Sequence, residues 1–322
     1  MNKPSPLLSV VVPCYRDAIG LPAMHARLVE ACRAAADSYE ILYIDDGSPD
    51  DTWGTITRIS RSDQTVVGIR LSRNHGHQLA VTTGLYYARG GRVLIIDSDL
   101  QDPPELLPEM MKIMDGGVDN VYGQRLSRKG VPAWKKFCYK AYYKLLSAMA
   151  GCYIPPDTGD FRLISRRVVD IINDMPEHHR FLRGMISWIG FRQQPIFYHR
   201  DARHEGESGY TLSKLFAIAV DGITSFSIKP LRVALLIGSV FAVLCLLGML
   251  FGLVGYFAGN VAVAGWTSIM VVVLLSSSLQ FFVLGVIGEY VGRLFVQSKG
   301  RPLYLVMETV GETGFTGGAQ RK

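Results

Sequence analysis

Charged residues are missing from one long stretch of this sequence. No Asp, Glu, Lys or Arg occurs from Ala234 to Gly288, although 19% of the 322 residues are charged. The stretch holds two apolar segments, from Ala234 to Phe257 and from Trp266 to Ile287. The first is about 36 Å long as a helix, against a hydrocarbon core of about 30 Å. We therefore predict two membrane-spanning helices.

These two spans are expected to form a hairpin, because the connector of residues 258–265 is too short for a domain. Basic residues flank the hairpin at both ends: Lys229, Arg232, Arg293, Lys299 and Arg301. Positive flanks favour the cytoplasm. The N-terminal segment has a short apolar run and no small-residue cleavage site, unlike a signal peptide. We expect a multi-pass protein of the cytoplasmic (inner) membrane, with both termini and the soluble part in the cytoplasm.

Motifs of several other classes are also absent. The five cysteines contain no Cys-x-x-Cys pair, so neither a zinc site nor a disulfide framework is predicted. No Gly-x-Gly-x-x-Gly follows the first apolar strand, which argues against a dinucleotide-dependent dehydrogenase. The net charge of +6 is scattered along the chain rather than collected in one arm. Beside two apolar spans, this favours an anionic membrane surface over nucleic acid as a partner.

Short apolar strands alternate with helices in the first part of the chain. The predicted strands are residues 7–12, 40–44, 66–71, 92–96 and 118–122, and the predicted helices are residues 21–36, 51–60, 77–88 and 103–114. This alternation is typical of an α/β fold with a mostly parallel sheet covered on both faces. Ligands of such sheets bind beyond the carboxyl ends of the strands.

A pair of aspartates at the end of the fourth predicted strand is the sharpest local signal. Asp97 and Asp99, separated by Ser98, precede a helix opened by two prolines. Hard carboxylate oxygens suit Mg²⁺ or Mn²⁺. An ion held here beside a diphosphate neutralises charge on a departing nucleoside diphosphate. The sequence therefore predicts a metal and donor site at this strand end, with Asp97 and Ser98 among the residues that bind the donor.

A second acidic cluster ends the second predicted strand. Asp45 and Asp46 are followed by Gly47 and Ser48. A carboxylate there can accept a hydrogen bond from a base N–H or a ribose hydroxyl. The alternative is a helix N-cap followed by acidic residues in the first turn, and both readings can hold together. We predict that Asp45 and Asp46 contact the nucleotide of the donor.

Several segments together resemble a known enzyme family. SVVVPCYRD, IDDGSPDDT, LSRNHGHQLA and IDSDLQDPPE resemble glycosyltransferase family 2, which has a GT-A (Rossmann-like) fold. DTGDFRLISR, FLRG, DGITSFSIKPLR and GEYVGR resemble its polyprenyl-phosphate (bactoprenol) glycosyltransferase group. The resemblance covers nearly the whole chain in order. No single motif is specific, but the combination is.

The resemblance implies inverting transfer of a sugar from a UDP-sugar to undecaprenyl or another polyprenyl phosphate on the cytoplasmic membrane face. The lipid-linked sugar would serve glycan or lipopolysaccharide modification in the cell envelope. Glucose is the first candidate, and 4-formamido-arabinose, mannose and GlcNAc are alternatives. The resemblance also implies a homo-oligomer and direct in-line attack without a covalent sugar–enzyme intermediate.

Site residues are also implied by the resemblance. It assigns metal and diphosphate binding to Asp97, Asp99 and Gln101. It assigns the donor pocket to Pro13, Tyr15 and Asp46, and catalysis to Asp160, Asp99 and Arg162. It assigns the acceptor phosphate to Arg200 and Arg203. Where relatives often have a lysine this chain has Gly209, and Lys214 is a candidate substitute.

Alternatives remain for these assignments. Asp160 and Arg162 are also consistent with a structural ion pair, and the two arginines with unselective binding of lipid headgroups. Residues 134–149 are predicted to form an amphipathic helix, which is expected to lie either on the membrane or on the protein surface. The histidines show no metal-binding spacing and are expected to be polar loop residues: His75, His77, His178, His179 and His204.

The division expected along the chain is a cytoplasmic GT-A domain at 1–229, a transmembrane hairpin at 230–290 and a cytoplasmic tail at 291–322. One rival class is a processive polysaccharide synthase, which is disfavoured because its Gln-x-x-Arg-Trp motif and additional spans are absent. A non-catalytic membrane scaffold that binds nucleotide sugars is the other. The presence of Asp46, Asp97, Asp99 and Asp160 argues against such a loss of activity.

Overall fold

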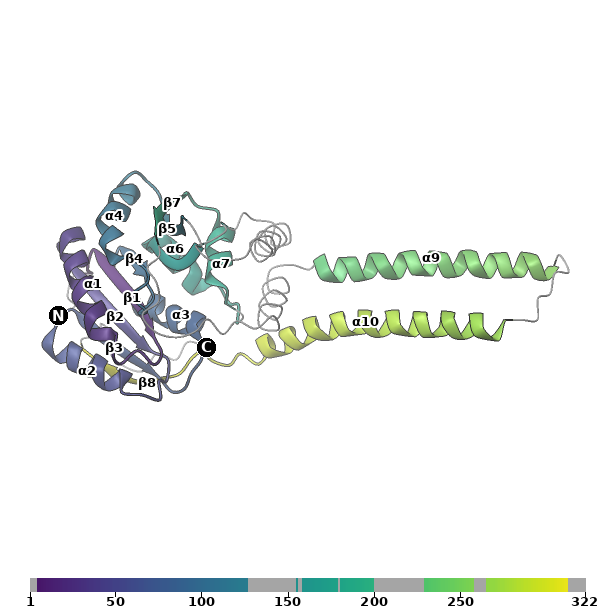
Figure 1. The fold of residues 1–322 in the computed structure, drawn as a ribbon, viewed down its shortest axis with the longest axis horizontal. Coiled ribbons are helices and arrows are strands. Elements are labelled where there is room, and N and C mark those ends of the chain that lie inside the picture. Colours follow the sequence, from purple (N-terminus) through teal and green to yellow (C-terminus); the bar gives the residue numbers. More distant parts are fainter. Residues whose placement is uncertain are drawn as a thin grey trace. The chain divides into compact units, whose positions relative to one another are not determined.

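The structure is a computed structural model that describes residues 5–126, 155, 158–178, 180–199, 229–257 and 265–311. It contains an eight-stranded sheet in the order β7-β5-β6-β4-β1-β2-β3-β8 (Figure 1). The strands are β1 Leu8–Cys14, β2 Tyr39–Asp45, β3 Val66–Leu71, β4 Arg92–Ile95, β5 Asn120–Arg125, β6 Thr158–Ser165, β7 Gln193–Tyr198 and β8 Val306–Val310.

Helices cover both faces of this sheet. They are α1 Leu21–Ala35, α2 Thr52–Ser62, α3 His77–Tyr87, the 3₁₀ turn η1 Pro104–Leu106, α4 Leu107–Asp115, α6 Arg166–Asp174 and α7 Leu182–Ile189. Helices α1, α2 and α4 pack on one face, whereas α3 and α6 pack on the other (Figure 1). All seven residues of β1 are buried, as expected for a strand covered on both sides.

Four neighbouring strands, β4, β1, β2 and β3, run parallel. The expected class, a mostly parallel α/β sheet flanked by helices, is therefore confirmed. No strand was expected at Thr158–Ser165, yet β6 lies antiparallel between β4 and β5. β6 is buried almost throughout, and its buried residues include Asp160 and Arg162. These two polar residues interrupt the apolar run by which a central strand is usually recognised. This insertion brings Asp160 beside the end of β4.

Helix α3 approaches β1 closely because Gly84 has no side chain. A Cβ added at Gly84 would lie 2.2 Å from Val11 Cγ1. We expect Gly84→Ala to destabilise the fold by about 1–3 kcal/mol through overpacking, although alanine is the better helix former by about 1 kcal/mol. Thermal unfolding of the purified protein measures this loss. Gly20→Ala is the control, since nothing lies within 4 Å of a Cβ there. Equal melting temperatures for the two variants would contradict the close packing.

The segment expected to be a tail contributes a strand. β8 pairs antiparallel with β3, with Val310 opposite Gly68 and Glu308 opposite Arg70. A Cβ at Gly68 would lie 2.7 Å from Val310 Cγ1, so glycine makes room for this edge strand. Ser72, just after β3, donates its N–H to the Leu305 carbonyl at 2.9 Å. A short, half-exposed edge strand carries little apolar pattern, which explains why the sequence did not reveal it.

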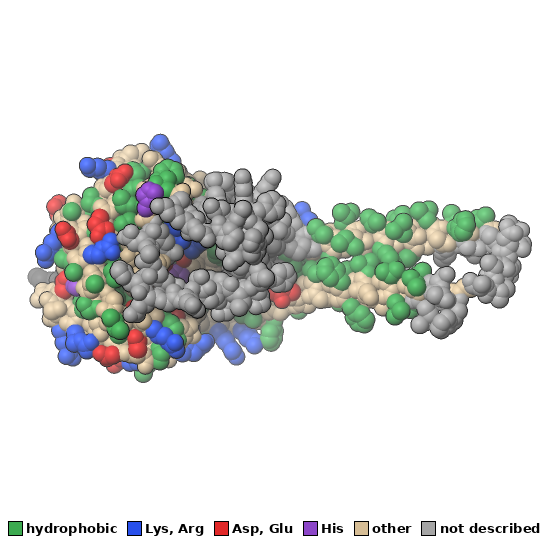
Figure 2. Space-filling view, in the orientation of Figure 1, with side chains coloured by type: hydrophobic (Ala, Val, Ile, Leu, Met, Phe, Trp, Pro, Cys, Tyr) green, Lys and Arg blue, Asp and Glu red, His purple; other side chains and the backbone are tan. Residues whose placement is uncertain are grey.

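The chain divides into two compact units, residues 1–216 with 301–322, and residues 217–300. The second contains α9 Lys229–Phe257 and α10 Trp266–Ser298, two antiparallel helices that contact each other (Figure 1). Segments Leu231–Gly248 and Val271–Ser298 are long and apolar enough to cross a membrane. Only 6% and 0% of these segments is buried, unlike core helices of a soluble protein. Figure 2 shows hydrophobic side chains along both helices.

Candidate active site

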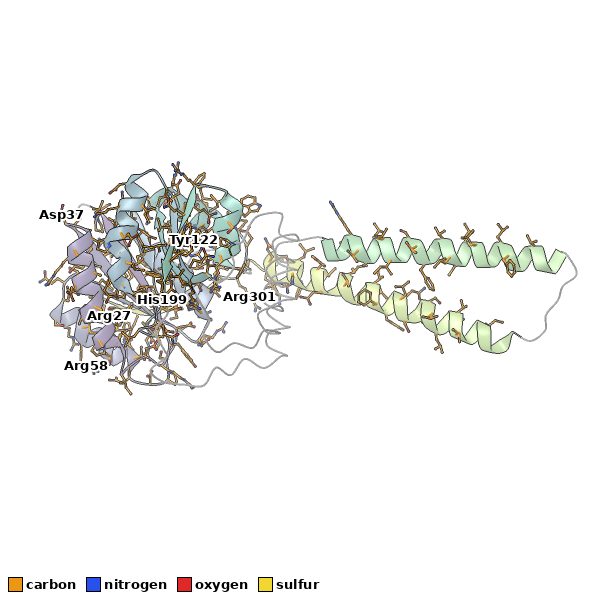
Figure 3. The ribbon with its side chains drawn as sticks, turned by 45° about the horizontal axis from the view of Figure 1, so that its top comes forward. Arg27, Asp37, Arg58, Tyr122, His199 and Arg301 are labelled. Atoms are coloured by element: carbon orange, nitrogen blue, oxygen red, sulfur yellow. The ribbon has the colours of Figure 1, made fainter. Side chains whose placement is uncertain are left out.

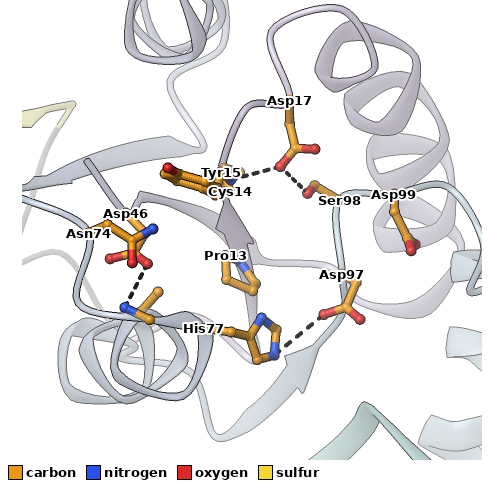
Figure 4. A pocket seen from close by; sticks show the side chains of 12 residues that line it. Pro13, Cys14, Tyr15, Asp17, Asp46, Asn74, His77, Asp97, Ser98 and Asp99 are labelled. Carbon is orange, nitrogen blue, oxygen red and sulfur yellow. Dashed lines mark hydrogen bonds and ion pairs between the residues drawn. The ribbon is translucent and has the colours of Figure 1, made fainter. Parts of the chain in front are cut away.

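A cleft of about 390 Å³ opens at the carboxyl ends of β1, β2 and β4, where ligands of parallel sheets bind (Figure 4). The structure brings together six residues that the sequence analysis assigned to the site: Pro13, Tyr15, Asp46, Asp97, Ser98 and Asp99. The other residues around the cleft are Cys14, Asp17, Asn74, Gly76, His77 and Ala80. The ends of β1, β2 and β4 with the residues that follow them supply most of its wall, and the loop before α3 and the first turn of α3 supply the rest.

Asp97 lies at the end of β4 with one carboxylate oxygen, the buried Oδ1, that makes no hydrogen bond with the described residues. The His77 ring nitrogen Nε2 is 3.7 Å from this oxygen. Burial, with smaller contributions from the carboxylates of Asp160, Asp102 and Asp99, raises the pKa of Asp97 to about 6 although His77 opposes the shift. A site with this excess of negative charge favours a bound cation.

The loop that carries Asp99 has an unusual backbone. Leu100 has φ +60°, which is uncommon for a residue with a side chain. Its carbonyl accepts a hydrogen bond from Arg27 Nη1 of α1, and Arg27 is bound in turn to Glu105. Gln101 is buried and donates its backbone N–H to Asp99 Oδ1 at 3.2 Å. Gln101 is not among the residues that line the cleft.

The described residues suit a metal ion whose coordination shell is completed by a bound substrate. No group of three His, Cys, Asp or Glu side chains within them converges to hold a metal ion. Mg²⁺ and Mn²⁺ sites in enzymes of phosphate chemistry commonly use one or two carboxylates, with substrate phosphates and water completing the shell. Asp97 and Asp99 both line the cleft at the end of β4, and the Asp97 Oδ1 atom makes no hydrogen bond within the described part of the chain, so two carboxylates are available for this role. The sheet edge thus suits a metal–diphosphate site rather than a metal cage made by protein alone.

Asp17 joins two loops of the cleft and was not expected from the sequence. Its Oδ2 accepts the Tyr15 N–H at 2.8 Å and the Ser98 hydroxyl at 2.6 Å (Figure 4). Burial is the main reason that the pKa of Asp17 is raised. Arg16 has φ +62°, and its guanidinium lies 5.3 Å from the centre of the Tyr15 ring. Asp17 therefore connects the residues after β1, including Tyr15, with Ser98 in the loop after β4.

Asp45 and Asp46 have different surroundings. Asp46 lines the cleft and accepts the N–H groups of His75 and Gly76 at 2.7 and 2.9 Å, which fixes the loop before α3.

Asp45 is fully buried and lies outside the cleft, where it accepts the Ser48 N–H and approaches Arg70 at 3.5 Å. Neither caps a helix, because α2 begins at Thr52. The structure thus places Asp46, but not Asp45, within reach of a ligand in the cleft.

Asp160 and Arg162 lie on one face of β6. Asp160 is bound to Arg183 at 2.7 Å and to His77 at 2.9 Å, so the ion pair with Arg162 that was considered as an alternative is not formed. Burial opposes ionisation, yet the charge of Arg183 and the bond to His77 hold the pKa of Asp160 well below its usual range. Arg162 is buried, donates to the Gly159 carbonyl at 3.0 Å, and has its pKa lowered to about 10 by burial.

Two residues of this network were missed in the sequence. His77 begins α3 and stands between Asp97 and Asp160, rather than being a polar loop residue. Arg183 lies in the first turn of α7. Both occur in motifs quoted above, LSRNHGHQLA and FLRG, which are the only signals that point to them. The contacts themselves join residues far apart in the chain, and no spacing rule reveals such contacts.

Some predictions lie outside the described residues. These are the acceptor-phosphate residues Arg200, Arg203 and Lys214, the helix at 134–149, and His179 and His204. Within the described residues, Cys14, Cys32 and Cys245 are free thiols.

Comparisons with known proteins give a consistent result. Residues 9–172 match the family model of Glycosyl transferase family 2. The chain is 41% identical to the uncharacterized glycosyltransferase YkcC of Bacillus subtilis, over 94% of each protein. It is 36% identical to the prophage bactoprenol glucosyl transferase homolog of Escherichia coli, over 93% of this chain and 98% of that protein.

Solved structures match this chain only at low identity. One is glucosyl-3-phosphoglycerate synthase from Mycobacterium tuberculosis in complex with Mn²⁺, UDP-glucose and phosphoglyceric acid. It is 18% identical, with a TM-score of 0.44 over 68% of this chain and 78% of that one.

Proposed function

Because this chain belongs to glycosyl transferase family 2, we propose that it transfers a sugar from a UDP-sugar to a polyprenyl phosphate at a membrane surface. The observation that carries the proposal is the acidic cleft at the strand ends, in a chain that also contains two exposed apolar helices. Together they suit a nucleotide-sugar donor that is soluble and an acceptor that is a lipid. Relatives named bactoprenol glucosyl transferases, aligned over nearly the whole chain, support the same pairing.

The donor would occupy the cleft with its nucleotide against β1 and β2. Tyr15 offers a half-exposed ring, and Asp46 lies at the end of β2. Asp97 and Asp99 would hold Mg²⁺ or Mn²⁺, which when bound neutralises the charge that develops on the departing UDP. We propose glucose as the sugar from the names of the relatives; 4-formamido-arabinose, mannose and GlcNAc are the alternatives.

The acceptor needs positioning more than activation. A polyprenyl monophosphate is already anionic at neutral pH, so its oxygen can attack the anomeric carbon in line and with inversion. Cationic side chains reduce its repulsion from the donor diphosphate. We retain Arg200, Arg203 and Lys214 as candidates for this role. The lipid tail would stay in the bilayer that α9 and α10 cross.

The path of the chain supports placing both ends of the hairpin on one membrane side. The sheet unit contains residues on both sides of the hairpin, up to 216 and again from 301, and β8 is one of its strands. Two crossings return the chain to the side that it left. With the positive flanks, this favours a catalytic unit and both termini in the cytoplasm. A homo-oligomer in the cytoplasmic membrane completes the proposal.

The test is direct transfer with the purified full-length protein in detergent. UDP-glucose and undecaprenyl phosphate are incubated with Mn²⁺, with Mg²⁺ or with a chelator, and the lipid is analysed by mass spectrometry. We expect one hexose to be added to the lipid phosphate only when a divalent ion is present. A panel of other UDP-sugars identifies the preferred donor. Donor binding without a lipid product across the whole panel would overturn the proposal.

Metal affinity is expected to fall as the pH drops through 6. The pKa of Asp97 is raised to about 6, chiefly by burial, so a proton competes with the cation below that pH. Affinity should weaken by up to about tenfold per pH unit on the acid side and change little on the alkaline side. Titration of Mn²⁺ with UDP-glucose present and no acceptor, from about pH 5 to about pH 7.5, measures the effect, because the diphosphate of a UDP-sugar does not titrate in this range. The Asp97→Asn variant should bind weakly without this pH dependence. Constant affinity in the unaltered protein would contradict the assignment of Asp97.

A further inference from the structure

The Asp160 carboxylate is enclosed by hydrogen-bonding groups from two helices. Arg183 Nε donates to Oδ1 at 2.7 Å. His77 Nε2 lies 2.9 Å from Oδ2, and Gln78 Nε2 donates to the same oxygen at 3.1 Å. The Asp160 side chain is only 8% exposed. A general base has to offer an oxygen to the proton that it removes, whereas both oxygens here are already engaged. The arrangement suits a fixed anion.

The Gln78 amide connects three elements through its two ends. Its Nε2 donates to Asp160 of β6, and its Oε1 accepts the Leu182 N–H at 3.0 Å. Gln78 lies in the first turn of α3, and Leu182 begins α7. An amide has one donor end and one acceptor end, so these two partners also fix its orientation. Gln78 therefore fixes the position of the first residue of α7 relative to the Asp160 carboxylate.

Arg183 is the cation that this arrangement positions. Its Nε binds Asp160, and its Nη1 donates to the Thr158 carbonyl at 2.9 Å. Two bonds on different nitrogens fix the plane of a guanidinium. The charges of Arg125 and Arg162 are close enough to interact with that of Arg183. Arg183 is linked to the acidic wall of the cleft through Asp160 and His77, and a fixed positive charge next to that wall suits an anionic acceptor.

We propose that Arg183 binds the acceptor phosphate and that Asp160 and Gln78 are positioning residues that hold it in place. The inference rests on the proposed function. In the transfer step a phosphate oxygen of the lipid forms the new bond to the anomeric carbon. The bond from that carbon to the UDP oxygen breaks, and UDP leaves with the electron pair. No proton has to move, because the attacking phosphate is already ionised, so Asp160 remains an anion throughout.

Binding of farnesyl phosphate, a short soluble polyprenyl phosphate, tests Arg183 without turnover. We expect Arg183→Gln to weaken binding by at least about tenfold and Gln78→Ala by about threefold to tenfold. Arg183→Lys should recover part of the loss. UDP binding with Mn²⁺ should be unchanged in all three variants, which also shows that they are folded. Arg58→Gln is the matched control, because Arg58 is 64% exposed on α2 (Figure 3).

The outcomes separate the inference from the proposed function. If the unaltered protein binds UDP but not farnesyl phosphate, the proposed acceptor is wrong and the inference falls with it. If the unaltered protein and Arg183→Gln bind farnesyl phosphate equally, the inference alone is overturned.

A double-mutant comparison of transfer rates tests the role of Asp160. If Asp160 acts only through Arg183, adding Asp160→Asn to Arg183→Gln should cost no further activity. A general base would cost at least about another tenfold in the same background. The dependence of kcat/KM on pH gives a second readout. Gln78→Ala should raise the KM for the lipid and leave the dependence of kcat/KM on pH unchanged. A shifted pH profile would indicate that Asp160 acts as a general base and would overturn its role as a positioning residue.

Discussion

Asp99→Ala is expected to reduce the rate of sugar transfer by roughly 100-fold to 1,000-fold, because a metal ion supplies several kcal/mol of charge stabilisation to a departing diphosphate. Asp99 lines the cleft two residues after Asp97, so both carboxylates face the same ligand space. Loss of one of two metal-binding carboxylates should also weaken Mn²⁺ binding in the presence of UDP. Initial rates at several Mn²⁺ concentrations measure both effects. Part of the activity should return at high metal concentration.

A matched control removes a carboxylate that has no place in the cleft. Asp115 ends α4, is 65% exposed and pairs with Arg92 on the surface. Asp115→Ala should keep the transfer rate and the Mn²⁺ affinity of the unaltered protein. If Asp99→Ala transferred sugar as fast as Asp115→Ala, the assignment of Asp99 to the metal would be wrong.

Glu40→Ala is expected to destabilise the fold by about 3 kcal/mol, because it removes a buried carboxylate that serves several donors. Glu40 accepts the Ser9 hydroxyl at 2.6 Å, the Arg89 N–H at 2.8 Å and the Arg89 guanidinium at 2.6 Å. Ser9 Oγ in turn accepts the Gly90 N–H. The network joins β1, β2 and the residues just before β4 at the amino-terminal ends of these strands, whereas the cleft lies at their carboxyl ends. Its loss leaves buried polar groups without partners.

Thermal unfolding in detergent measures this loss, with Glu105→Ala as the control. Glu105 makes a comparable two-bond contact with Arg27, but it is 56% exposed, and an exposed pair contributes less than about 1 kcal/mol. The melting temperature of Glu40→Ala should therefore fall by clearly more than that of Glu105→Ala. Equal losses would show that the Glu40 network is not a main support of the sheet.

Residues at strand ends were predictable because two simple rules agree there. Apolar strands followed by acidic clusters identify the carboxyl edge of a parallel sheet, and ligands bind at that edge. Asp46, Asp97 and Asp99 were placed in this way, and the structure brings them to one cleft. Asp45 shows where the rule stops. Neighbouring residues of an extended chain point to opposite sides, so one of two consecutive aspartates faces the ligand and the other faces Arg70.

Contacts between distant segments were not predictable in the same way. Asp160 reaches His77 across 83 positions of sequence, and Asp17 reaches Ser98 across 81. Periodicity describes one element at a time and carries no information on such pairs. Strand β6 was missed for a related reason: its buried polar residues are satisfied by partners elsewhere in the fold, and the sequence shows only an interrupted apolar run. Tertiary contacts therefore determine both that β6 is a strand and which residues surround Asp160 and Asp17.

Strand β8 makes the hairpin an insertion into the catalytic domain rather than an appendage at its end. Cutting the chain before α9 to obtain a water-soluble enzyme would remove the edge strand beside β3. The backbone groups next to Gly68 would then be open to pairing with other chains, a common cause of aggregation. A soluble version therefore has to excise the hairpin, join the two cut ends with a short linker and keep residues 301–311.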